Sequence, residues 1–369
     1  MPSEPAPASN AFKHWFNEQR YRDLAALLAA EARRFDREHF LRTTLTGLEE
    51  RELMDRVRQT ALACEAALSG TYRDKVHVLR AIAPQVGHTF VGIALCDFVA
   101  RYGLDDPDFS LAALRELTRY GSAEFAVRPF LVRDLAGTLQ TLTRWAEDED
   151  EHVRRLASEG SRPRLPWGVR LTALVRDPDP TGPILERLQD DPSLYVRKSV
   201  ANHLNDIAKD HPDRVIARVS AWNRGRPGTA WIVRHALRTL IKRGDARALS
   251  LLGATGRPSV SVRAFAARPK TLRLGDALEL QTTFRSTGRK VQSLVVDYVI
   301  HYVKANGSTS GKVFKWTRVE LAPGAEVSLV KRQVIKDFST RRHQAGVHRI
   351  ELQINGQRPA ETSFVLRRP

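Results

Sequence analysis

The spacing of apolar residues changes near residue 256, and this change limits the possible folds more than any other feature of the chain. Up to that point, apolar residues recur three and four positions apart, which is typical of amphipathic helices. Clear examples lie at 20–35, 48–68, 72–86, 111–120 and 134–147. We therefore predict that the chain up to residue 255 is helical.

Beyond residue 256, β-branched residues and an alternation of apolar and polar positions predict strands. Seven such segments, separated by turns rich in Gly, Pro and Asn, lie at 259–267, 277–286, 293–304, 312–321, 325–335, 347–355 and 362–367. Seven strands in about 110 residues are typical of an immunoglobulin-like sandwich. We therefore predict a mainly α protein with three parts: a disordered tail at 1–10, a HEAT-like helical region at 11–255 and an all-β immunoglobulin-like sandwich at 256–369.

The HEAT-like assignment depends on a weak repeat in the helical region. A Val-Arg pair precedes an apolar helical run three times, with arginines at Arg154, Arg197 and Arg234 that are 43 and 37 residues apart. HEAT-type helical pairs repeat at about 40–47 residues, and about three copies are needed to bury a continuous core. The sequence favours an α-solenoid. The alternative is an unrelated helical bundle in which the Val-Arg pairs coincide by chance.

The charge of the chain indicates a polyanionic partner. The formal net charge is +17, and residues 256–369 contain 21 Lys and Arg against 8 Asp and Glu, a net charge of +13 for that part alone. An excess of positive charge attracts nucleic acid first, through its phosphates, and an anionic membrane surface second. We expect the sandwich to contact DNA; the alternative is a charged surface that only keeps the protein in solution.

Several functional classes are excluded or disfavoured by what the sequence lacks. Its two cysteines, Cys64 and Cys96, lie in apolar helical context and do not suffice for a disulfide framework or a cysteine zinc site. We find no P-loop, HExxH, GxSxG or dinucleotide motif, and the histidines, His203 and His211 included, show no ligand spacing. We expect no metal and no cofactor. Without a secretory signal or a long apolar run, we also expect a cytoplasmic protein that does not enter a membrane.

One linker, ASEGSRPRLPWGVRL at 157–171, combines side chains that rarely occur together in a loop. It contains Glu159, Arg162, Arg164 and Trp167. A large aromatic side chain on a loop is costly to expose, so Trp167 either waits for a ligand or is buried as a hydrophobic plug between two repeats. The carboxylate, the guanidinium groups and the indole mark this linker as the candidate functional site.

Segments on either side of the linker extend the candidate site. Upstream, Glu124 is a second candidate acid, although it also lies where a helix-capping glutamate can occur. Downstream, Lys198, Asn202, Asn205 and Lys209 are spaced by 4, 3 and 4 residues, so on a helix they would share one face. Such a stripe can bind phosphates, but an ordinary solvated helix face gives the same pattern.

EGSRPRLPW at 159–167, together with VRKSVANHLNDIAKDHP at 196–212, resembles the HEAT-like-repeat alkylpurine DNA glycosylases. The order of the helical region and the immunoglobulin-like domain resembles the branch called alkylpurine DNA glycosylase C, over essentially the whole chain after the tail. The resemblance implies that Glu159 and Glu124 are catalytic and that Trp167, Phe125 and Asp206 contact the lesion or its sugar. It also implies a DNA-binding set: Arg155, Arg162, Arg164, Arg197, Lys198, Asn202, Asn205, Lys209 and Arg234.

The function implied by this resemblance is hydrolysis of the N-glycosidic bond of cationic N-methylated bases in duplex DNA, with 3-methyladenine and 3-methylcytosine as candidates. We expect a monofunctional enzyme without cofactor, acting as a monomer in the cytoplasm at the nucleoid. The main alternative is a non-enzymatic HEAT-repeat scaffold that binds DNA or a protein. That alternative leaves the acids Glu124 and Glu159 unexplained on a face meant for phosphates. A surface adhesin is disfavoured by the missing signal sequence.

Overall fold

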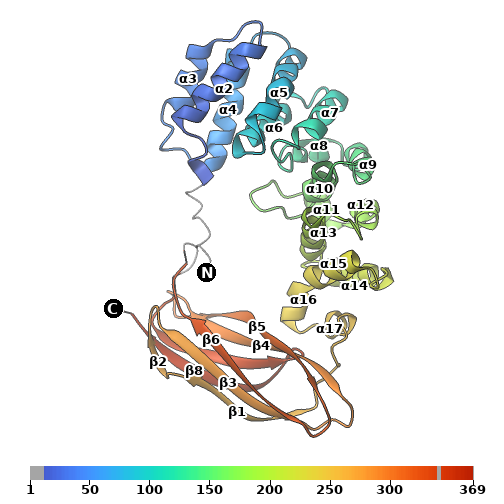
Figure 1. Cartoon of the computed structure of the whole chain (residues 1–369), viewed down its shortest axis with the longest axis vertical. Helices are drawn as coiled ribbons and strands as arrows, with labels where there is room; N and C mark the ends of the chain where they lie inside the picture. Colours follow the sequence, from blue (N-terminus) through green and yellow to red (C-terminus); the bar gives the residue numbers. More distant parts are fainter. Residues whose placement is uncertain (1–11, 339–341, 369) are drawn as a thin grey trace. The chain divides into compact units, whose positions relative to one another are not determined.

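The computed structural model describes residues 12–338 and 342–368, so the predicted tail at 1–10 lies outside the described residues. A succession of helices is followed by strands, as Figure 1 shows. The chain divides into two compact units, Met1–Asp210 with Trp222–Ala236, and His211–Ala221 with Leu237–Pro369. The second unit therefore contains the last helices as well as the strands, and the boundary that we predicted at residue 256 falls inside it.

The first unit is helical throughout. Its longest early helices match the predicted segments closely; α5 spans Tyr72–Val86, the range that the sequence pattern indicates. The helices of this unit are α2 (Glu18–Glu31), α3 (Arg37–Leu45), α4 (Leu53–Ala67), α5 (Tyr72–Val86), α6 (Phe90–Tyr102), α7 (Pro107–Leu117), α8 (Arg128–Arg133), α9 (Leu135–Trp145), α10 (Glu151–Gly160), α11 (Thr172–Arg176), η1 (Asp179–Thr181), α12 (Gly182–Arg187), α13 (Leu194–Ile207) and α15 (Pro227–Ala236).

Helices α10 and α13 are the two that matter most for the site, and their sequences define where they begin. The side chain of Asp150 accepts a hydrogen bond from the backbone of His152 at the start of α10. Ser193 accepts one from the backbone of Tyr195 at the start of α13. Such side chains satisfy backbone donors that have no partner within the helix. The two helices pack against each other, and each carries buried apolar residues, such as Val153 on α10 and Val200 on α13.

The Val-Arg repeat has a structural basis in two of its three copies. Arg154 donates from Nη1 to the carbonyls six and five residues before it, at 2.9 and 2.8 Å. Arg197 makes the same two contacts with the carbonyls six and five residues before it, at 2.8 and 2.7 Å. Each arginine thus fixes the turn that leads into its own helix. Arg154 also pairs with Asp191 in the next such turn, at 2.7 Å, whereas Arg234 is exposed.

The second unit contains two β-sheets and three helices: α14 (Pro212–Ala221), α16 (Arg238–Arg243) and α17 (Ala246–Leu251). Its strands are β1 (Val260–Arg268), β2 (Thr271–Arg273), β3 (Ala277–Ser286), β4 (Gln292–Val303), β5 (Thr309–Leu321), β6 (Glu326–Val334), β7 (Gly346–Ile354) and β8 (Gln357–Arg367). One sheet has the order β1-β3-β6 and the other β2-β8-β7-β4-β5. Side chains from both sheets, such as Leu280 and Ile350, form one buried core.

Seven of these eight strands follow the predicted segments, and β2 is the one that the sequence analysis missed. It has only three residues, which pair in parallel with the end of β8. Three residues are too few to show the alternation that indicates a strand. Among the described residues, no helix has the length and apolar character needed to cross a membrane.

Candidate active site

Glu159 lies in the last turn of α10 and is 5% exposed. Its Oε1 accepts a hydrogen bond from Nη1 of Arg162 at 2.5 Å and lies 3.7 Å from Nη2 of Arg155. Its Oε2 accepts a hydrogen bond from the Ser199 hydroxyl of α13 at 2.6 Å. A carboxylate has about four lone-pair sites, so these partners fix its orientation and leave acceptor capacity for a ligand.

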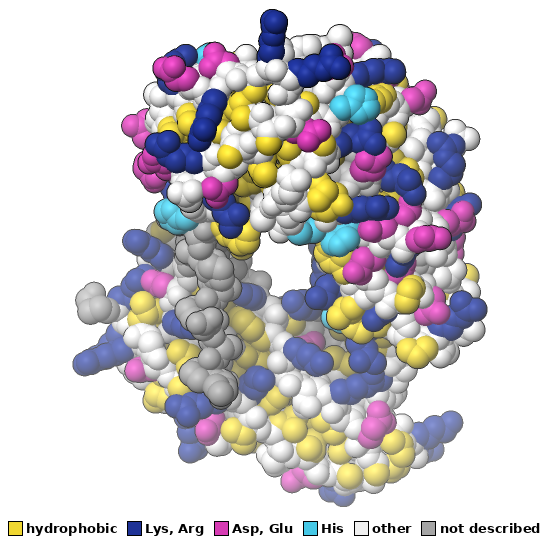
Figure 2. All heavy atoms as spheres, turned by 45° about the horizontal axis from the view of Figure 1, so that its top comes forward, with side chains coloured by type: hydrophobic (Ala, Val, Ile, Leu, Met, Phe, Trp, Pro, Cys, Tyr) yellow, Lys and Arg dark blue, Asp and Glu magenta, His cyan; other side chains and the backbone are white. Residues whose placement is uncertain are grey.

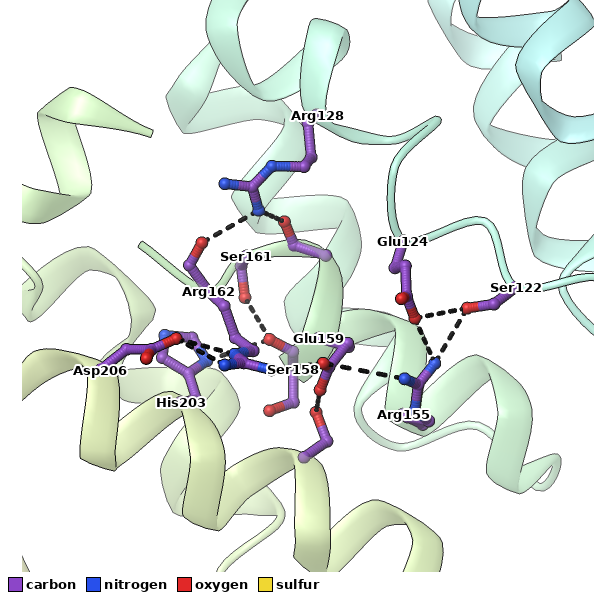
Figure 3. A network of polar contacts seen from close by, with 12 residues as sticks. Ser122, Glu124, Arg128, Arg155, Ser158, Glu159, Ser161, Arg162, His203 and Asp206 are labelled. Carbon is purple, nitrogen blue, oxygen red and sulfur yellow. Dashed lines mark hydrogen bonds and ion pairs between the residues drawn. The ribbon is translucent and has the colours of Figure 1, made fainter. Parts of the chain in front are cut away.

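Glu124 belongs to the same network through a shared arginine. Nη1 of Arg155 lies 2.6 Å from Oε2 of Glu124 and 2.9 Å from the hydroxyl of Ser122, which itself donates to Glu124 at 2.7 Å. Figure 3 shows these contacts leading from Glu124 through Arg155 to Glu159. Helix α8 begins after Val127 without a side-chain cap. Glu124 is therefore a member of the site, and the capping interpretation is wrong.

Arg155 is held from two directions. Its guanidinium lies over the ring of Tyr195, with 4.6 Å from Cζ to the ring centroid, while its nitrogens face the two glutamates. Burial acts to lower the pKa of Arg155, but Glu124 and Glu159 outweigh it, and the pKa lies above its usual value. Arg155 is therefore a fixed cation between two acids.

Arg162 forms a second bridge, from the linker to α13. Besides its bond to Glu159, it donates from Nε to Asp206 at 2.8 Å. The other oxygen of Asp206 pairs with Nζ of Lys209 at 2.8 Å. Burial again acts to lower the pKa of Arg162, but the neighbouring carboxylates raise it above its usual value. Arg162 thus contacts both of the other predicted site residues, Glu159 and Asp206, as Figure 3 shows.

Trp167 lies at the tip of the linker with its side chain 68% exposed, so it is no plug between repeats. Its φ of 64° is in the left-handed region that few residues other than glycine adopt. Exposure of so large an apolar side chain, in a backbone conformation that costs free energy, is typical of functional sites. Val169 beside it is also exposed.

The predicted DNA-binding residues do not all lie where the sequence pattern puts them. Asn205 is 4% exposed, and Lys209 lies beyond the end of α13, so the predicted stripe is not one exposed helix face. Lys198 and Arg234 are exposed, and Asn202 and Phe125 are half-buried. Arg164 pairs with Asp210 through two nitrogens at 2.8 and 2.9 Å, and Arg197 is bound to its turn.

Several residues of the network were not predicted as site residues, among them Ser122, which contacts both Glu124 and Arg155. Ser199 orients Glu159, Tyr195 supports Arg155, and Arg128 bonds to carbonyls of the linker. Ser199 and Tyr195 lie on the same helix as the predicted Lys198 and Asp206. Their spacing along that helix was the one sequence signal that could have indicated a place in the site. Among the described residues, no group of His, Cys, Asp and Glu side chains is arranged to hold a metal ion.

The arrangement suits the stabilisation of positive charge on a bound ligand. Two carboxylates, Glu124 and Glu159, are held in place by arginines and lie beside a linker that presents an aromatic ring. Groups that are already oriented need no rearrangement when charge develops on a reacting molecule, and partial burial strengthens their effect. Carboxylates stabilise a cation, and the face of an indole attracts one.

Comparison with known proteins relates the segment that contains these residues to a family. A model described as DNA alkylation repair enzyme matches residues 118–240, the segment that carries the whole network. A second model, the C-terminal Ig-like domain of the uncharacterised protein YhaZ, matches residues 261–368. A helical region that matches the DNA alkylation repair model is thus followed by an Ig-like domain that matches the YhaZ model. This combination places the chain in a class of DNA alkylation repair proteins.

Two relatives cover nearly the whole chain. Uncharacterized protein YhaZ of Bacillus subtilis is 40% identical over 346 residues, which are 94% of this chain and 96% of the relative. A solved structure of the Pseudomonas fluorescens alkylpurine DNA glycosylase AlkC, bound to DNA containing an abasic site analog, is 44% identical, with a TM-score of 0.94 over 98% of this chain and 100% of that one. The chain belongs to the AlkC branch of the DNA alkylation repair enzyme family.

Proposed function

We propose that the protein is a DNA glycosylase that hydrolyses the N-glycosidic bond of cationic N-methylated bases in duplex DNA, with 3-methyladenine and 3-methylcytosine as its substrates. The observation that carries the proposal is the carboxylate of Glu159, buried and oriented by Arg162 and Ser199 at the start of the linker that also carries the exposed Trp167. The 44% identity to a glycosylase solved with an abasic site analog in its DNA supports it.

The chemistry follows from the charge of the base. A base made cationic by methylation leaves with the electron pair of the C1′–N bond and becomes neutral, so it requires no strong acid. Positive charge then develops on the deoxyribose, as in other glycosyl transfers. Carboxylates in a partly buried site lower the free energy of that charge. A normal base stays neutral until its bond breaks, and it is spared because the site does not protonate it.

Glu159 is the residue that we assign to the sugar. Its carboxylate lies beside the developing charge and orients the attacking water, which forms the new C–O bond and gives up its proton to the carboxylate. Glu124 assists with its negative charge, and Arg155 links it to Glu159. Trp167 attracts the cationic base or sugar through its ring face, an interaction of about 0.5–2 kcal/mol, with Phe125 and Asp206 as further contacts at the lesion.

The main role of the arginines of the network is to hold the two glutamates in position. Arg155 and Arg162 lie against carboxylates at 2.6 and 2.5 Å, which supports a role in holding Glu124 and Glu159 in position. We therefore expect the DNA phosphates to be bound by cations at the protein surface. Among the predicted residues, Lys198 and Arg234 are exposed, and Arg164 pairs with Asp210, which is also at the surface.

We assign the enzyme to the monofunctional class, which releases the base and leaves the DNA strand intact. A strand-cleaving glycosylase forms a Schiff base through an amine. Lys209 is the lysine of this network, and its Nζ lies 2.8 Å from Asp206 in an ion pair. Borohydride treatment of the reacting complex should trap no covalent adduct; an adduct at Lys209 would contradict the assignment.

The helical region is proposed to be a HEAT-like solenoid. Arg154 and Arg197 bind the turns before their own helices in the same way, and Arg154 bonds onward to Asp191 of the next turn. A structural unit that repeats this way is the basis of solenoid folds. We further propose that one chain suffices for activity, that the basic sandwich contacts duplex DNA, and that the protein acts at the nucleoid in the cytoplasm.

A base-release assay tests the proposal directly. Duplex DNA methylated to carry 3-methyladenine, 3-methylcytosine and 7-methylguanine is incubated with the protein, and free bases and abasic sites are counted. We expect free 3-methyladenine and 3-methylcytosine in equal number to new abasic sites. Tight binding without release of any base would overturn the proposal and favour the non-enzymatic scaffold.

A further inference from the structure

Arg128, the first residue of α8, is 1% exposed and is bound to carbonyls. Nη1 donates to the carbonyls of Gly160 at 2.8 Å and Arg162 at 2.9 Å, and Nε donates to the carbonyl of Val169 at 2.6 Å. Among the described residues, no carboxylate lies within ion-pair distance of this guanidinium. One side chain from outside the linker therefore bonds to both of its stems, as Figure 3 shows for the first of them.

The three acceptors have defined positions relative to the site. Gly160 follows Glu159 directly at the end of α10, and Arg162 is the residue that pairs with Glu159. Val169 lies on the other stem, two residues after Trp167. The guanidinium of Arg128 thus connects the backbone that carries the catalytic carboxylate to the backbone that carries the exposed indole.

The linker is a closed loop around this contact. The amide of Leu171 bonds to the carbonyl of Pro163 at 3.2 Å, and the amide of Gly168 bonds to the carbonyl of Leu165 at 3.2 Å. Gly168 packs directly on Arg128, because a Cβ there would lie 3.3 Å from both Cδ and Nε of the arginine. The backbone next to Trp167 therefore packs on the Arg128 side chain.

Arginine suits this place better than any other residue. Its planar fork presents several N–H donors in fixed directions, whereas lysine offers a single ammonium at the end of a flexible stem. Burial, and the nearby charge of Arg162, lower the pKa of Arg128 to about 10, which still leaves it a cation at neutral pH. Burying a cation costs free energy, and for Arg128 the bonds that offset this cost join the two stems of the linker.

We propose that Arg128 is a positioning residue for the glycosylase reaction, which sets the place and direction of Trp167 relative to Glu159. This inference rests on the proposed function and adds a residue to it that contacts neither the base nor the sugar. A residue of this kind affects the rate through the geometry of others, and small displacements of reacting groups have large effects on rate.

The chain offers a matched control in Arg56. It too is fully buried and donates to three carbonyls, those of Arg51, Lys13 and Phe16, at 3.0, 3.0 and 2.7 Å; unlike Arg128, it also lies near a carboxylate, with Nη2 3.6 Å from Glu49. These acceptors lie in the N-terminal part of the helical unit, away from the network. Arg56→Lys therefore reports the loss of stability that follows from weakening a buried, carbonyl-bound arginine. Arg128→Lys reports a loss of the same kind together with any effect on the site.

Amide hydrogen exchange tests the inference without the need for activity. In Arg128→Lys, the amides of Gly168 and Leu171 should exchange about tenfold faster, because the bonds that close the loop open more often. Exchange within α13 should stay as in the wild type. Arg56→Lys should leave the loop unchanged. Unaltered exchange of both loop amides in Arg128→Lys would overturn the inference.

A double-mutant cycle on base release provides the second test. In the wild-type background, we expect Arg128→Lys to slow single-turnover base release about tenfold. In the Trp167→Ala background, the same change should slow release less than about twofold, because Arg128 acts on the rate through the indole that is then already missing. Arg56→Lys should slow neither form. Gly168→Ala keeps the charge and crowds both Leu165 and Arg128, with its Cβ 3.1 Å and 3.3 Å from them, and should give the same pattern as Arg128→Lys even if the lysine variant folds poorly. Equal losses in both backgrounds would contradict the inference.

The two tests separate this inference from the proposed function. If the wild type releases no base, the proposed function fails, and hydrogen exchange still decides whether Arg128 sets the loop. If the wild type releases bases, Trp167→Ala slows that release and exchange of the loop amides is unaltered in Arg128→Lys, the function stands and the inference fails.

Discussion

Arg162 donates a hydrogen bond to Glu159 from three residues further along the chain, at 2.5 Å, and both side chains are buried. The linker that presents Trp167 therefore also supplies the cation that holds the acid. This explains how acids persist in a chain of net charge +17 whose proposed ligand is a polyanion. In the proposed reaction, the arginines position the carboxylates, and the carboxylates face the charge that develops on the sugar.

Loss of the Arg162 guanidinium should destabilise the site as well as inactivate it. Arg162→Met leaves Glu159 and Asp206 buried without their shared partner, a change that costs about 3–5 kcal/mol in comparable buried pairs. Urea unfolding of the full chain measures the loss. Arg162→Lys keeps the charge and should lose less, and a methionine variant as stable as the wild type would contradict this account.

Tyr195 should affect the reaction through Arg155. Tyr195→Leu removes the ring under the guanidinium, an interaction of about 0.5–2 kcal/mol, so we expect base release to slow by roughly 2- to 30-fold. Tyr195→Phe keeps the ring and serves as the control, with a rate near that of the wild type. If the phenylalanine and leucine variants are equally slow, the hydroxyl matters and the ring contact does not.

We expect Asp297 to make the second unit less stable above pH 6 than at pH 4. It is 5% exposed on β4, and burial raises its pKa to about 6, against the opposing effect of Lys315 and Lys242. The folded form therefore holds a proton that the unfolded chain releases near pH 4, and stability falls as the pH rises from 4 through 6.

Asp297→Asn should remove this dependence. We expect the variant to be more stable than the wild type by about 1–3 kcal/mol at pH 8 and by little at pH 4, because the aspartate is neutral in the folded protein at the lower pH. Urea unfolding at both values measures the difference. An equal difference at pH 4 and pH 8 would show that ionisation of Asp297 is not its cause.

Salt dependence tests the proposed contact between the sandwich and DNA. Figure 2 shows Lys and Arg side chains on the sandwich as well as on the helical unit. Arg289, Lys290 and Arg332 are exposed cations of the sandwich. Each phosphate contact contributes about 0.9 to the slope of log affinity against log salt. The triple change to Gln should make the slope shallower, whereas an unchanged slope would remove these residues from the DNA contact.

The sequence predicted the parts of the protein that are determined locally. The switch from helix to strand periodicity, the linker with Glu159 and Trp167, and seven strands follow from short-range patterns. β2 was missed because its three residues gain their structure from pairing with β8. The alternatives for Trp167 and Glu124 were decided only by exposure and by contacts with residues far along the chain.

The partners of the site residues were not predictable for a related reason. Arg155 and Arg162 look like phosphate ligands in a basic sequence, yet each lies against a carboxylate. Arginine is mostly exposed in proteins, so nothing in the local sequence marks Arg128 as fully buried. Burial of a charged residue depends on acceptors supplied by other segments, here the linker at 160–169.

The Glu159→Gln variant tests the central claim most directly. The amide keeps the shape of the side chain and an acceptor for Ser199 but loses the charge, so release of 3-methyladenine from duplex DNA should fall by about 10²- to 10³-fold. Affinity for a duplex with an abasic site analog should stay within about threefold, since phosphate contacts dominate it. Glu151→Gln, at the exposed start of the same helix, is the control and should keep the wild-type rate. Release by Glu159→Gln at the wild-type rate would contradict the account.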